Sequence, residues 1–449
     1  MAALDVVFKA YDIRGTVPDQ LDEDLARSIG TAFVRFSAAD TVLIARDMRS
    51  SGVALTAAFA DGATAEGADV VDLGMASTDL LYFAAGHLDA PGAMFTASHN
   101  PAQYNGIKLC LSGARPVGQD TGLGEIKACV AQGVTPSGAR RGTVRHEDLL
   151  QQYAAHVRSF ADASQLRPLR VIADTANGMG GLVVPEVFKE LPFDLTVLYG
   201  ELDGSFPNHP ADPIQPENLK DLQRTVVDSG ADVGLAFDGD ADRVFLVDER
   251  GQPLSGSLTT AMVAASMLQK HPGATIIYNL ICSKAVPEVI REGGGSPLRS
   301  RVGHSFIKEL MAESGAVFGG EHSGHYYFRD NFRADSGLIA SVIVLELLSV
   351  AGQPLSELRR PYERYAASGE INTEVDDPTA VLERVAAAYE GADQDRLDGL
   401  TVDLGDWWFN VRPSNTEPLL RLNLEAATGD ACDVHVQEVL AIIKEGKTD

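Results

Sequence analysis

The loop that begins at Asp238 carries carboxylates at alternate positions, with Asp240 and Asp242, and ends in Arg243. It follows the apolar run of residues 233–237, which is typical of a buried strand. A loop at the end of a strand can turn several carboxylate oxygens towards one hard cation, and Mg²⁺ is commonly bound by carboxylates together with a substrate phosphate. The segment therefore predicts an enzyme that acts on phosphorylated molecules.

Other interpretations of this loop have to be weighed. Asp at its first, third and fifth positions also opens an EF-hand calcium loop, with Glu249 at the twelfth, but the sixth position is Arg243 where that loop needs glycine. A solvated acidic turn without a ligand is the plainest alternative. An aspartyl-phosphate phosphotransferase, with Asp238 as nucleophile and Asp240 as acid, stays open because an apolar strand ending in Asp-x-Asp suits that chemistry too.

A second loop, Thr96-Ala97-Ser98-His99-Asn100-Pro101, follows another short apolar strand. It presents the hydroxyl of Ser98 at a strand end, where a covalent phosphoryl group could be attached. Lys108 lies close by in the sequence and could stabilise charge or move a proton. The alternative for Ser98 alone is a turn hydroxyl bonded to the backbone.

A third loop, residues 319–325, places Glu321 and Ser323 among glycines and imidazoles. Glu321 can accept two hydroxyl protons and Ser323 can donate or accept, so the loop suits the recognition of a sugar. A zinc site on His322 and His325 is disfavoured, since their spacing is short and no cysteine is near.

A fourth loop begins at Arg412 and continues through Ser414, Asn415 and Thr416, with Arg421 beyond it. An arginine fork with hydroxyls, an amide and backbone N–H groups could bind a phosphate. A polar turn before a strand is the alternative. Two smaller basic groups lie elsewhere, at Lys9 and Arg14 and at Arg301, His304 and Lys308.

Composition limits the class of protein. A chain of 449 residues exceeds one hydrophobic core and predicts about three or four domains. The net charge of −26 argues against nucleic acid or an anionic membrane as partner. An anionic substrate then requires local basic residues or a metal. The 4 cysteines are scattered, and no signal segment or long apolar run is evident, so we expect a cytoplasmic protein with reduced thiols.

Apolar runs alternate with amphipathic stretches over most of the chain, which predicts α/β units in series. We expect strands at residues 41–45, 69–73, 93–96, 106–111, 169–173, 233–237, 244–247 and 274–278, and helices at 54–65 and 258–268. The remaining segment reads as a smaller α+β unit, with strands at 369–375, 401–404 and 419–424 and helices at 378–389 and 434–444.

Taken together and in this order, the four loops and the start Ala-Tyr-Asp-Ile-Arg-Gly resemble the α-D-phosphohexomutase superfamily. The resemblance covers essentially the whole chain, and residues 206–213 are similar to its bacterial phosphomannomutase/phosphoglucomutase branch. It implies a heart-shaped enzyme with a central cleft, built from three similar three-layer α/β domains and a C-terminal α+β domain. The implied domains are residues 1–142 with the phosphoserine loop, 143–252 with the metal loop, 253–367 with the sugar loop and 368–449 with the phosphate loop.

The resemblance also implies roles for individual residues. Ser98 would be the phosphoserine, and it would hold Mg²⁺ together with Asp238, Asp240 and Asp242. Lys108 and His304 would transfer protons, while Arg14 and Arg243 would lie near the phosphoryl group. Sugar hydroxyls would be held by Glu321, Ser323 and His325, and the distal phosphate by Arg412, Ser414, Asn415, Thr416 and Arg421.

The expected activity is the interconversion of mannose 6-phosphate and mannose 1-phosphate through a hexose 1,6-bisphosphate, which would also serve as activator; activity on the glucose pair is expected as well. The alternatives are a phosphoglucosamine mutase, an aspartyl-phosphate phosphotransferase built on Asp238, and a sugar-phosphate sensor without catalysis. We expect a hexose phosphate as the partner, neither nucleic acid nor membrane, and a monomer or homodimer.

Overall fold

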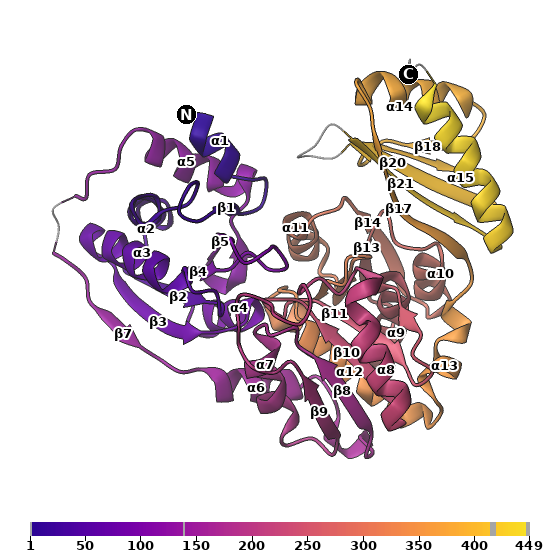
Figure 1. Cartoon of the computed structure of the whole chain (residues 1–449), viewed down its shortest axis with the longest axis horizontal. Coiled ribbons are helices and arrows are strands. Elements are labelled where there is room, and N and C mark those ends of the chain that lie inside the picture. The colour runs from indigo at the N-terminus through magenta and orange to yellow at the C-terminus, as the bar shows by residue number, and fades with distance from the viewer. Residues whose placement is uncertain (1, 138–139, 414–418, 446–449) are drawn as a thin grey trace.

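The computed structural model describes residues 2–137, 140–413 and 419–445, without the side chains of residues 2, 3 and 304. Four β-sheets, of seven, five, four and five strands in chain order, form the centres of domains I to IV. Domain I and domain IV stand apart at the top of Figure 1, and domains II and III join them below. This arrangement gives the molecule its heart shape.

Domain I contains α1 (Ala2–Val7), β1 (Ile13–Thr16), α2 (Glu23–Ser37), β2 (Thr41–Arg46), α3 (Gly52–Glu66), β3 (Asp69–Met75), α4 (Thr78–His87), β4 (Gly92–Phe95), β5 (Tyr104–Leu111), β6 (Arg115–Pro116), α5 (Leu123–Ala131) and β7 (Val144–His146). Domain II contains α6 (Leu150–Arg158), β8 (Arg170–Asp174), α7 (Gly180–Phe188), β9 (Asp194–Leu198), α8 (Lys220–Ser229), β10 (Val233–Phe237), β11 (Val244–Asp248) and β12 (Pro253–Leu254).

Domain III contains α9 (Gly256–Lys270), β13 (Thr275–Asn279), α10 (Ala285–Glu292), β14 (Ser296–Ser300), α11 (His304–Ser314), β15 (Phe318–Gly320), β16 (Tyr326–Phe328), α12 (Gly337–Ala351) and α13 (Leu355–Leu358). Domain IV contains β17 (Ala366–Glu374), α14 (Pro378–Ala388), β18 (Asp393–Asp395), β19 (Leu400–Asp403), β20 (Trp407–Pro413), β21 (Leu419–Ala426) and α15 (Gly429–Lys444).

One four-stranded unit recurs in the first three domains. In domain I the strands run β5-β4-β2-β3, with β4 antiparallel to β5 and parallel to β2, and β2 parallel to β3. Domain II repeats this order and these directions as β11-β10-β8-β9, and domain III as β16-β15-β13-β14. The carboxyl ends of parallel strands meet at one edge of a sheet, where α/β proteins bind ligands.

Domain IV differs from the other three, because every neighbouring pair of strands in its sheet, in the order β17-β21-β20-β19-β18, is antiparallel. Helices α14 and α15 pack against this sheet. The prediction of three similar α/β units followed by a smaller α+β unit is confirmed.

The expected strands and helices are confirmed within a few residues, whereas many other elements were not predicted, among them α2, α4, α8, α12 and β20. The sheet of domain I includes β7, which lies just after residue 142, and the exact domain boundaries stay a prediction.

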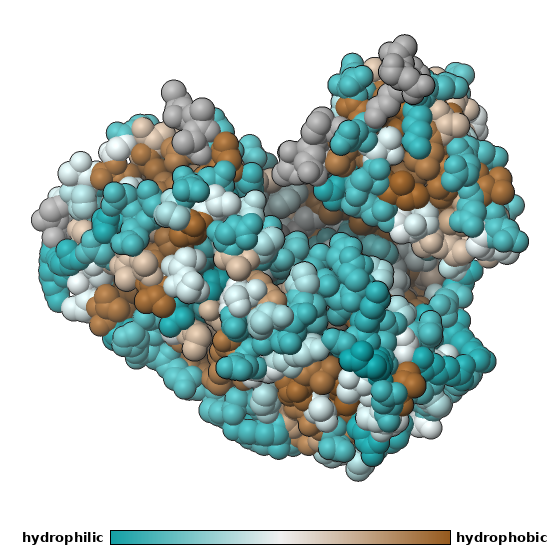
Figure 2. All heavy atoms as spheres, in the orientation of Figure 1, coloured by the Kyte–Doolittle hydropathy of each residue, from teal (hydrophilic) through white to brown (hydrophobic). Residues whose placement is uncertain are grey.

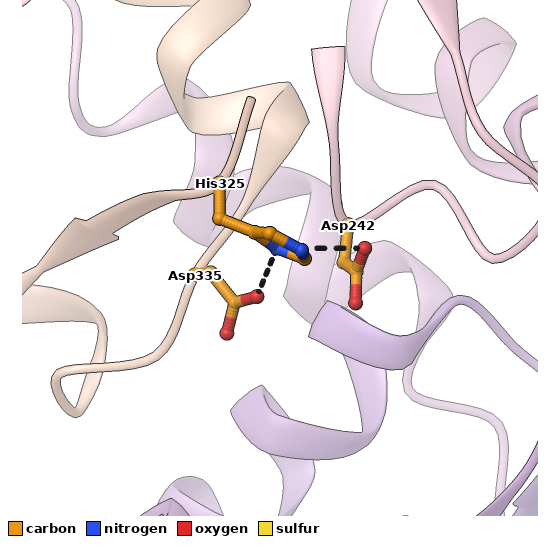
Figure 3. A group of neighbouring side chains, drawn as sticks. All are labelled: Asp242, His325 and Asp335. Atoms are coloured by element: carbon orange, nitrogen blue, oxygen red, sulfur yellow. Dashed lines mark hydrogen bonds and ion pairs between the residues drawn. The ribbon is translucent and has the colours of Figure 1, made fainter. Parts of the chain in front are cut away.

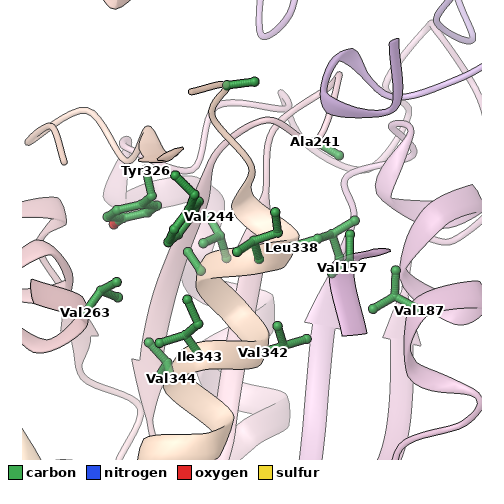
Figure 4. Packing of buried hydrophobic residues seen from close by; sticks show 14 of the residues in the cluster. Val157, Val187, Ala241, Val244, Val263, Tyr326, Leu338, Val342, Ile343 and Val344 are labelled. Atoms are coloured by element: carbon green, nitrogen blue, oxygen red, sulfur yellow. The ribbon is translucent and has the colours of Figure 1, made fainter. Parts of the chain in front are cut away.

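Helix α12 lies at the centre of a hydrophobic core that domains I, II and III share. Its sequence is apolar on every face, which is typical of a helix surrounded by protein. Ser336 caps its first turn by accepting a hydrogen bond from the Ile339 N–H at 3.1 Å. Figure 4 shows Leu338 and Val342 of this helix beside Val244 of β11 and Val157 of α6.

A buried polar junction ties the three domains together at Asp79, near the start of α4. Its carboxylate accepts hydrogen bonds from the hydroxyls of Ser77, Tyr153 and Ser336, the last at 2.7 Å. Burial raises the pKa of Asp79 to about 7, although the three hydroxyls oppose the rise. Since Tyr153 belongs to α6 and Ser336 caps α12, one carboxylate joins elements of all three domains.

Among the described residues, no single helix is both long and apolar enough to cross a bilayer. The segments Gly337–Ala351 and Leu355–Tyr362 meet the length and composition test only as a pair, bent by 92°. The first of them is the buried helix α12.

Replacing Asp79 with alanine should destabilise the unit formed by domains I to III by about 3 kcal/mol, because three buried hydroxyls lose their acceptor and a cavity remains. Calorimetric unfolding of the variant and of Asp40→Ala, which removes an exposed carboxylate of the same domain, measures the difference. Equal midpoints for the two variants would contradict the role given to this junction.

Candidate active site

In each repeated unit, the loop that leads into the antiparallel strand carries the side chains that could take part in a reaction. The loop from β4 to β5 holds Ser98, the loop from β10 to β11 holds Asp238, Asp240 and Asp242, and the loop from β15 to β16 holds Glu321. Each loop leaves the carboxyl end of a parallel strand and returns into an antiparallel one. The fold therefore brings three loops that are far apart in the sequence to one place.

Ser98 lies directly beside the acidic loop. Its Oγ donates a hydrogen bond to Oδ2 of Asp238 over 2.7 Å, and both side chains are buried. One oxygen from each of Asp238, Asp240 and Asp242 lies within 4.8 Å of the others. The close approach depends on Gly239, since a Cβ there would lie 2.4 Å from the carbonyl oxygen of Ser98.

Lysine and threonine side chains of domain I face the same carboxylates. Lys108 on β5 donates from Nζ to Oδ2 of Asp240 and Oδ2 of Asp242, both at 2.7 Å. Thr78, the first residue of α4, donates from Oγ1 to Oδ2 of Asp240 at 2.5 Å. Burial alone would lower the pKa of Lys108, but the two carboxylates outweigh it and raise the pKa well above its ordinary value. Lys108 is therefore a cation here.

The acidic loop fits a divalent cation. Burial raises the pKa of Asp238 to about 7, with repulsion from Asp240 and Asp242 adding to the rise and Arg243 opposing it. Oδ1 of Asp240 and Oδ1 of Asp242 are buried and accept no hydrogen bond from any described residue. Buried carboxylate oxygens without a partner are costly unless a cation binds them. A metal held by oxygen ligands would satisfy both and relieve the repulsion.

Two arginines flank Ser98. Arg243 donates from Nε to Oδ2 of Asp238 at 2.9 Å, while its Nη2 lies 3.4 Å from the Ser98 Oγ and 2.6 Å from Nδ1 of His99. Arg14 on β1 donates to Oδ1 of Asn100, in the serine loop, at 2.5 Å. The Arg243 guanidinium therefore lies at the Ser98 hydroxyl, and the Arg14 guanidinium lies against the loop that carries Ser98.

His325 connects domain III to the acidic loop. Its Nδ1 lies 2.8 Å from Oδ2 of Asp335 and 3.8 Å from Oδ1 of Asp242. Figure 3 shows the ring of His325 in contact with both carboxylates. Lys308 forms an ion pair with the other oxygen of Asp335 at 2.9 Å. Burial alone would lower the pKa of His325, but Asp242 and Asp335 together raise it. The imidazole is oriented through Nδ1, with Nε2 at the opposite side of the ring.

The sugar loop is held rigidly. Glu321 is buried and accepts hydrogen bonds from the hydroxyl of Tyr327 at 2.6 Å and from Nδ2 of Asn279 at 3.1 Å. Ser323 is half-buried, and Gly324 after it has φ +86°. A carboxylate oriented in this way can still accept hydroxyl protons, because each oxygen has a second lone pair.

A cleft of about 1260 Å³ lies between domains I, III and IV. It is lined by more basic than acidic side chains, the basic ones being Lys9, Arg115, Arg301, Lys308, Arg333, Arg412 and Arg421. Figure 2 shows the surface hollowed between domain I and domain IV. The net charge of −26 should repel an anionic substrate, but the local positive charge lets an anion enter this cleft.

On domain IV, Arg412 and Arg421 lie opposite each other on β20 and β21. Each forms an ion pair with Glu370 at 3.1 Å. Burial lowers the pKa of Arg412, while Glu370 opposes the change. Ser414, Asn415 and Thr416, which the sequence assigns to the same phosphate site, lie outside the described residues.

The structure brings Ser98, Lys108, Arg14, Arg243 and the three aspartates together, with His325 at their edge. Glu321 and Ser323 share a loop with His325, and Arg412 and Arg421 face the cleft from domain IV. His304 begins α11, but its side chain is not among those described.

Sequence reasoning missed Thr78 and Asp335 and treated Lys308 only as part of a basic group. For Thr78 a signal existed, because it follows β3 at the carboxyl edge of the sheet, where ligands bind. For Asp335 we find no sequence signal.

Four family models match the chain in order. They are the phosphoglucomutase/phosphomannomutase α/β/α domain I at residues 5–135, domain II at 151–251, domain III at 255–365 and the C-terminal domain at 370–442.

Curated relatives match nearly the full length. A phosphomannomutase from Salmonella montevideo is 40% identical, with 97% of this chain and 98% of the relative covered. Proteins named phosphohexose mutases from Xanthomonas campestris pv. campestris are also 40% identical, with 97% and 99% covered.

Among solved structures, a phosphoglucomutase/phosphomannomutase family protein from Burkholderia thailandensis superposes with a TM-score of 0.90 at 34% identity, covering 98% of both chains. The relatives and the repeated loops define the class of enzyme as the phosphohexomutases, which are isomerases acting on hexose phosphates. Within that class, the chain belongs to the phosphoglucomutase/phosphomannomutase family.

Adding Mg²⁺ or Mn²⁺ should raise the midpoint temperature of unfolding. At a metal concentration a hundred times the dissociation constant, the free energy of unfolding should increase by about 2.7 kcal/mol. Replacing Asp240 with asparagine should weaken this effect strongly, because the side chain loses its negative charge and one of its two oxygens. Thermal shift with metal titration measures both, and Asp228→Asn, on the exposed face of α8, is the control. Full metal stabilisation in Asp240→Asn would contradict the site.

Proposed function

We propose that this chain interconverts mannose 6-phosphate and mannose 1-phosphate by passing a phosphoryl group through Ser98, with a hexose 1,6-bisphosphate as intermediate and activator. The observation that supports the proposal best is the 2.7 Å contact between the Ser98 Oγ and Asp238, inside a group of three buried carboxylates. A phosphoserine carries about 1.5 to 2 negative charges near neutral pH. It fits beside these carboxylates only if cations surround it.

The chain supplies two of these cations. Arg243 lies against Asp238 and the Ser98 Oγ, and Lys108 lies against Asp240 and Asp242. In the proposed reaction both would face the charge on the transferring group, and Arg14 would orient the serine loop through Asn100. Phosphoryl transfer requires mainly positioning and positive charge from the protein. Mg²⁺, bound by the three aspartates and Ser98, would neutralise further charge on the phosphoryl oxygens.

Proton transfer accompanies each phosphoryl transfer. Lys108 is protonated, so it suits the role of a proton donor or fixed charge better than that of a base. The sugar hydroxyl must give its proton to a base when it attacks the phosphoserine. We assign this role to His304, whereas His325, whose pKa Asp242 and Asp335 raise, suits proton donation better.

The substrate would span the cleft. Glu321, Ser323 and His325 would hold the sugar hydroxyls, and Arg412 and Arg421 with Ser414, Asn415 and Thr416 would hold the phosphate that is not reacting. Because both phosphates of the bisphosphate are chemically alike, an arginine site can hold either one, which lets the intermediate turn around between the two transfers.

The preference for mannose rests on the relatives, since those from Salmonella and Escherichia coli are named phosphomannomutases at 39–40% identity. Mannose and glucose differ only in the direction of the 2-hydroxyl, so we also expect turnover of the glucose phosphates.

The alternative in which Asp238 is the phosphorylated residue fits the contacts less well. Its Oδ2 already accepts hydrogen bonds from Ser98 and Arg243, and its Oδ1 accepts from the backbone N–H of Arg243 at 3.2 Å.

Replacing Ser98 with alanine should reduce mannose phosphate turnover by a factor of at least about 10³, because no residue remains to carry the phosphoryl group. A coupled isomerisation assay measures the rate, and circular dichroism confirms the fold. Ser164→Ala, which removes an exposed serine hydroxyl of domain II, is the matched control. A Ser98→Ala enzyme with wild-type turnover would refute the proposal.

Mass spectrometry of wild-type enzyme treated with mannose 1,6-bisphosphate identifies the phosphorylated residue. An alkali-stable phosphate on Ser98 supports the phosphoserine route. An alkali-labile acyl phosphate on Asp238 would refute the phosphoserine route and support the aspartyl-phosphate alternative.

A further inference from the structure

Arg49 is one of the largest fully buried side chains in the described part of the chain, at 1% exposure. It follows β2, at the same carboxyl edge of the domain I sheet as the serine loop after β4. No signal in the sequence links it to that loop. Its guanidinium group nevertheless makes most of its hydrogen bonds there.

Four of these bonds go to backbone carbonyl oxygens of the loop that carries Ser98. The acceptors are Ser98 at 2.9 Å, Asn100 at 2.6 Å, Pro101 at 2.8 Å and Tyr104 at 3.0 Å. A planar group with five N–H donors can serve several carbonyls at once, which an ammonium group on a flexible stem cannot reproduce. Each carbonyl left without a donor in this interior would be destabilising, because a buried acceptor has lost its water without gaining a partner.

The amide side of Ser98 is fixed by the same network. Arg49 also donates from Nε to Oδ2 of Asp47 at 3.1 Å, and that oxygen accepts from the Thr96 hydroxyl at 2.7 Å. The Thr96 Oγ1 in turn accepts from the Ser98 N–H at 2.9 Å. The peptide groups on both sides of Ser98 are therefore held in one closed chain of buried hydrogen bonds.

These hydrogen bonds are needed because Ser98 has an unfavourable backbone conformation. Its φ is +47°, in the left-handed region that residues with a side chain adopt at a cost. The same conformation accompanies the contact of its Oγ with Asp238. A relaxed loop would rotate Ser98 and move the hydroxyl away from the acidic loop.

Residues of domain II pack against Arg49 as well. The ring of Phe206 lies 5.1 Å from the Arg49 Cζ, and a Cβ at Gly204 would come within 2.7 Å of the Arg49 Cα. Arg49 is thus enclosed between the serine loop and domain II, so that a substrate cannot contact it.

We propose that Arg49 is a positioning residue for phosphoryl transfer, which fixes Ser98 against the acidic loop without touching the substrate. This inference rests on the proposed function of Ser98. A displacement of a reacting group by about 1 Å can reduce a rate by about a hundredfold, so the bonds of Arg49 should affect the transfer step far more than substrate binding.

The test compares Arg49→Ala, Arg49→Lys and the control Arg35→Ala, whose arginine forms an exposed ion pair with Glu66 on the same domain. Arg49→Ala should lower kcat by about a hundredfold or more, with KM for mannose 1-phosphate changed less than threefold. Phosphorylation of Ser98 by mannose 1,6-bisphosphate, followed by mass spectrometry, should slow by the same factor.

Chemical rescue separates positioning from general stability. Guanidinium or methylguanidinium at about 20 mM, far below denaturing concentrations, should restore at least tenfold of kcat to Arg49→Ala, because the cation can enter the vacated space and bind the same carbonyls. Methylammonium should not. If Arg49→Ala does not fold, Arg49→Lys keeps the charge and should still lose about tenfold in kcat at unchanged KM.

A kcat within threefold of wild type in the folded variants, or a loss confined to KM, would overturn the inference. So would a loss of kcat in Arg49→Ala that guanidinium does not relieve. These outcomes are distinct from failure of the proposed function, which an active Ser98→Ala enzyme alone would reveal.

Discussion

The buried carboxylates of the acidic loop cannot all be ionised side by side unless positive charge lies among them. Two unit charges 4 Å apart interact by about 4 kcal/mol even at an effective dielectric constant of 20. Lys108 and Arg243 provide two cations against three carboxylates, and a phosphate on Ser98 would increase the negative excess further. A divalent ion is therefore the natural complement of this group, and the repeated strand order of domains I to III brings its residues together.

The assembly depends on the repeat of one α/β unit. In each of domains I to III, the connection from a parallel strand to the antiparallel strand carries the candidate site residues, so the same topological position supplies Ser98, the three aspartates and Glu321, to which we assign phosphoryl transfer, metal binding and sugar binding. No single domain contains a working site. The shared core around α12 and the junction at Asp79 fix the three domains relative to one another, so that the three loops meet. Thr78, next to Asp79 in the sequence, also bonds Asp240 in the acidic loop.

The sequence predicts those features that are local. Alternate aspartates after an apolar run, a serine at a strand end and arginines in a polar loop can each be recognised within a few residues. The contact of Thr78 with Asp240 spans 162 positions and that of Arg49 with Ser98 spans 49, and neither partner carries a local sign of the other. Helix α12 escaped prediction for a related reason, since a helix that is apolar on every face has no periodic pattern to reveal it.

Domain IV is attached to the other domains mainly through polar contacts with domain III. Its contacts with domain III include the ion pair of Lys284 with Asp403 at 2.6 Å and a hydrogen bond from the Val302 N–H to Asp398 at 3.2 Å. Partly exposed pairs of this kind contribute little to stability, in contrast to the apolar core that the other three domains share. A substrate with a phosphate at Arg412 and another at Ser98 would add strong charge-assisted bonds across the same gap. The bound hexose phosphate would then itself be the strongest link between domain IV and the rest, which couples closure of the cleft to the presence of the intermediate.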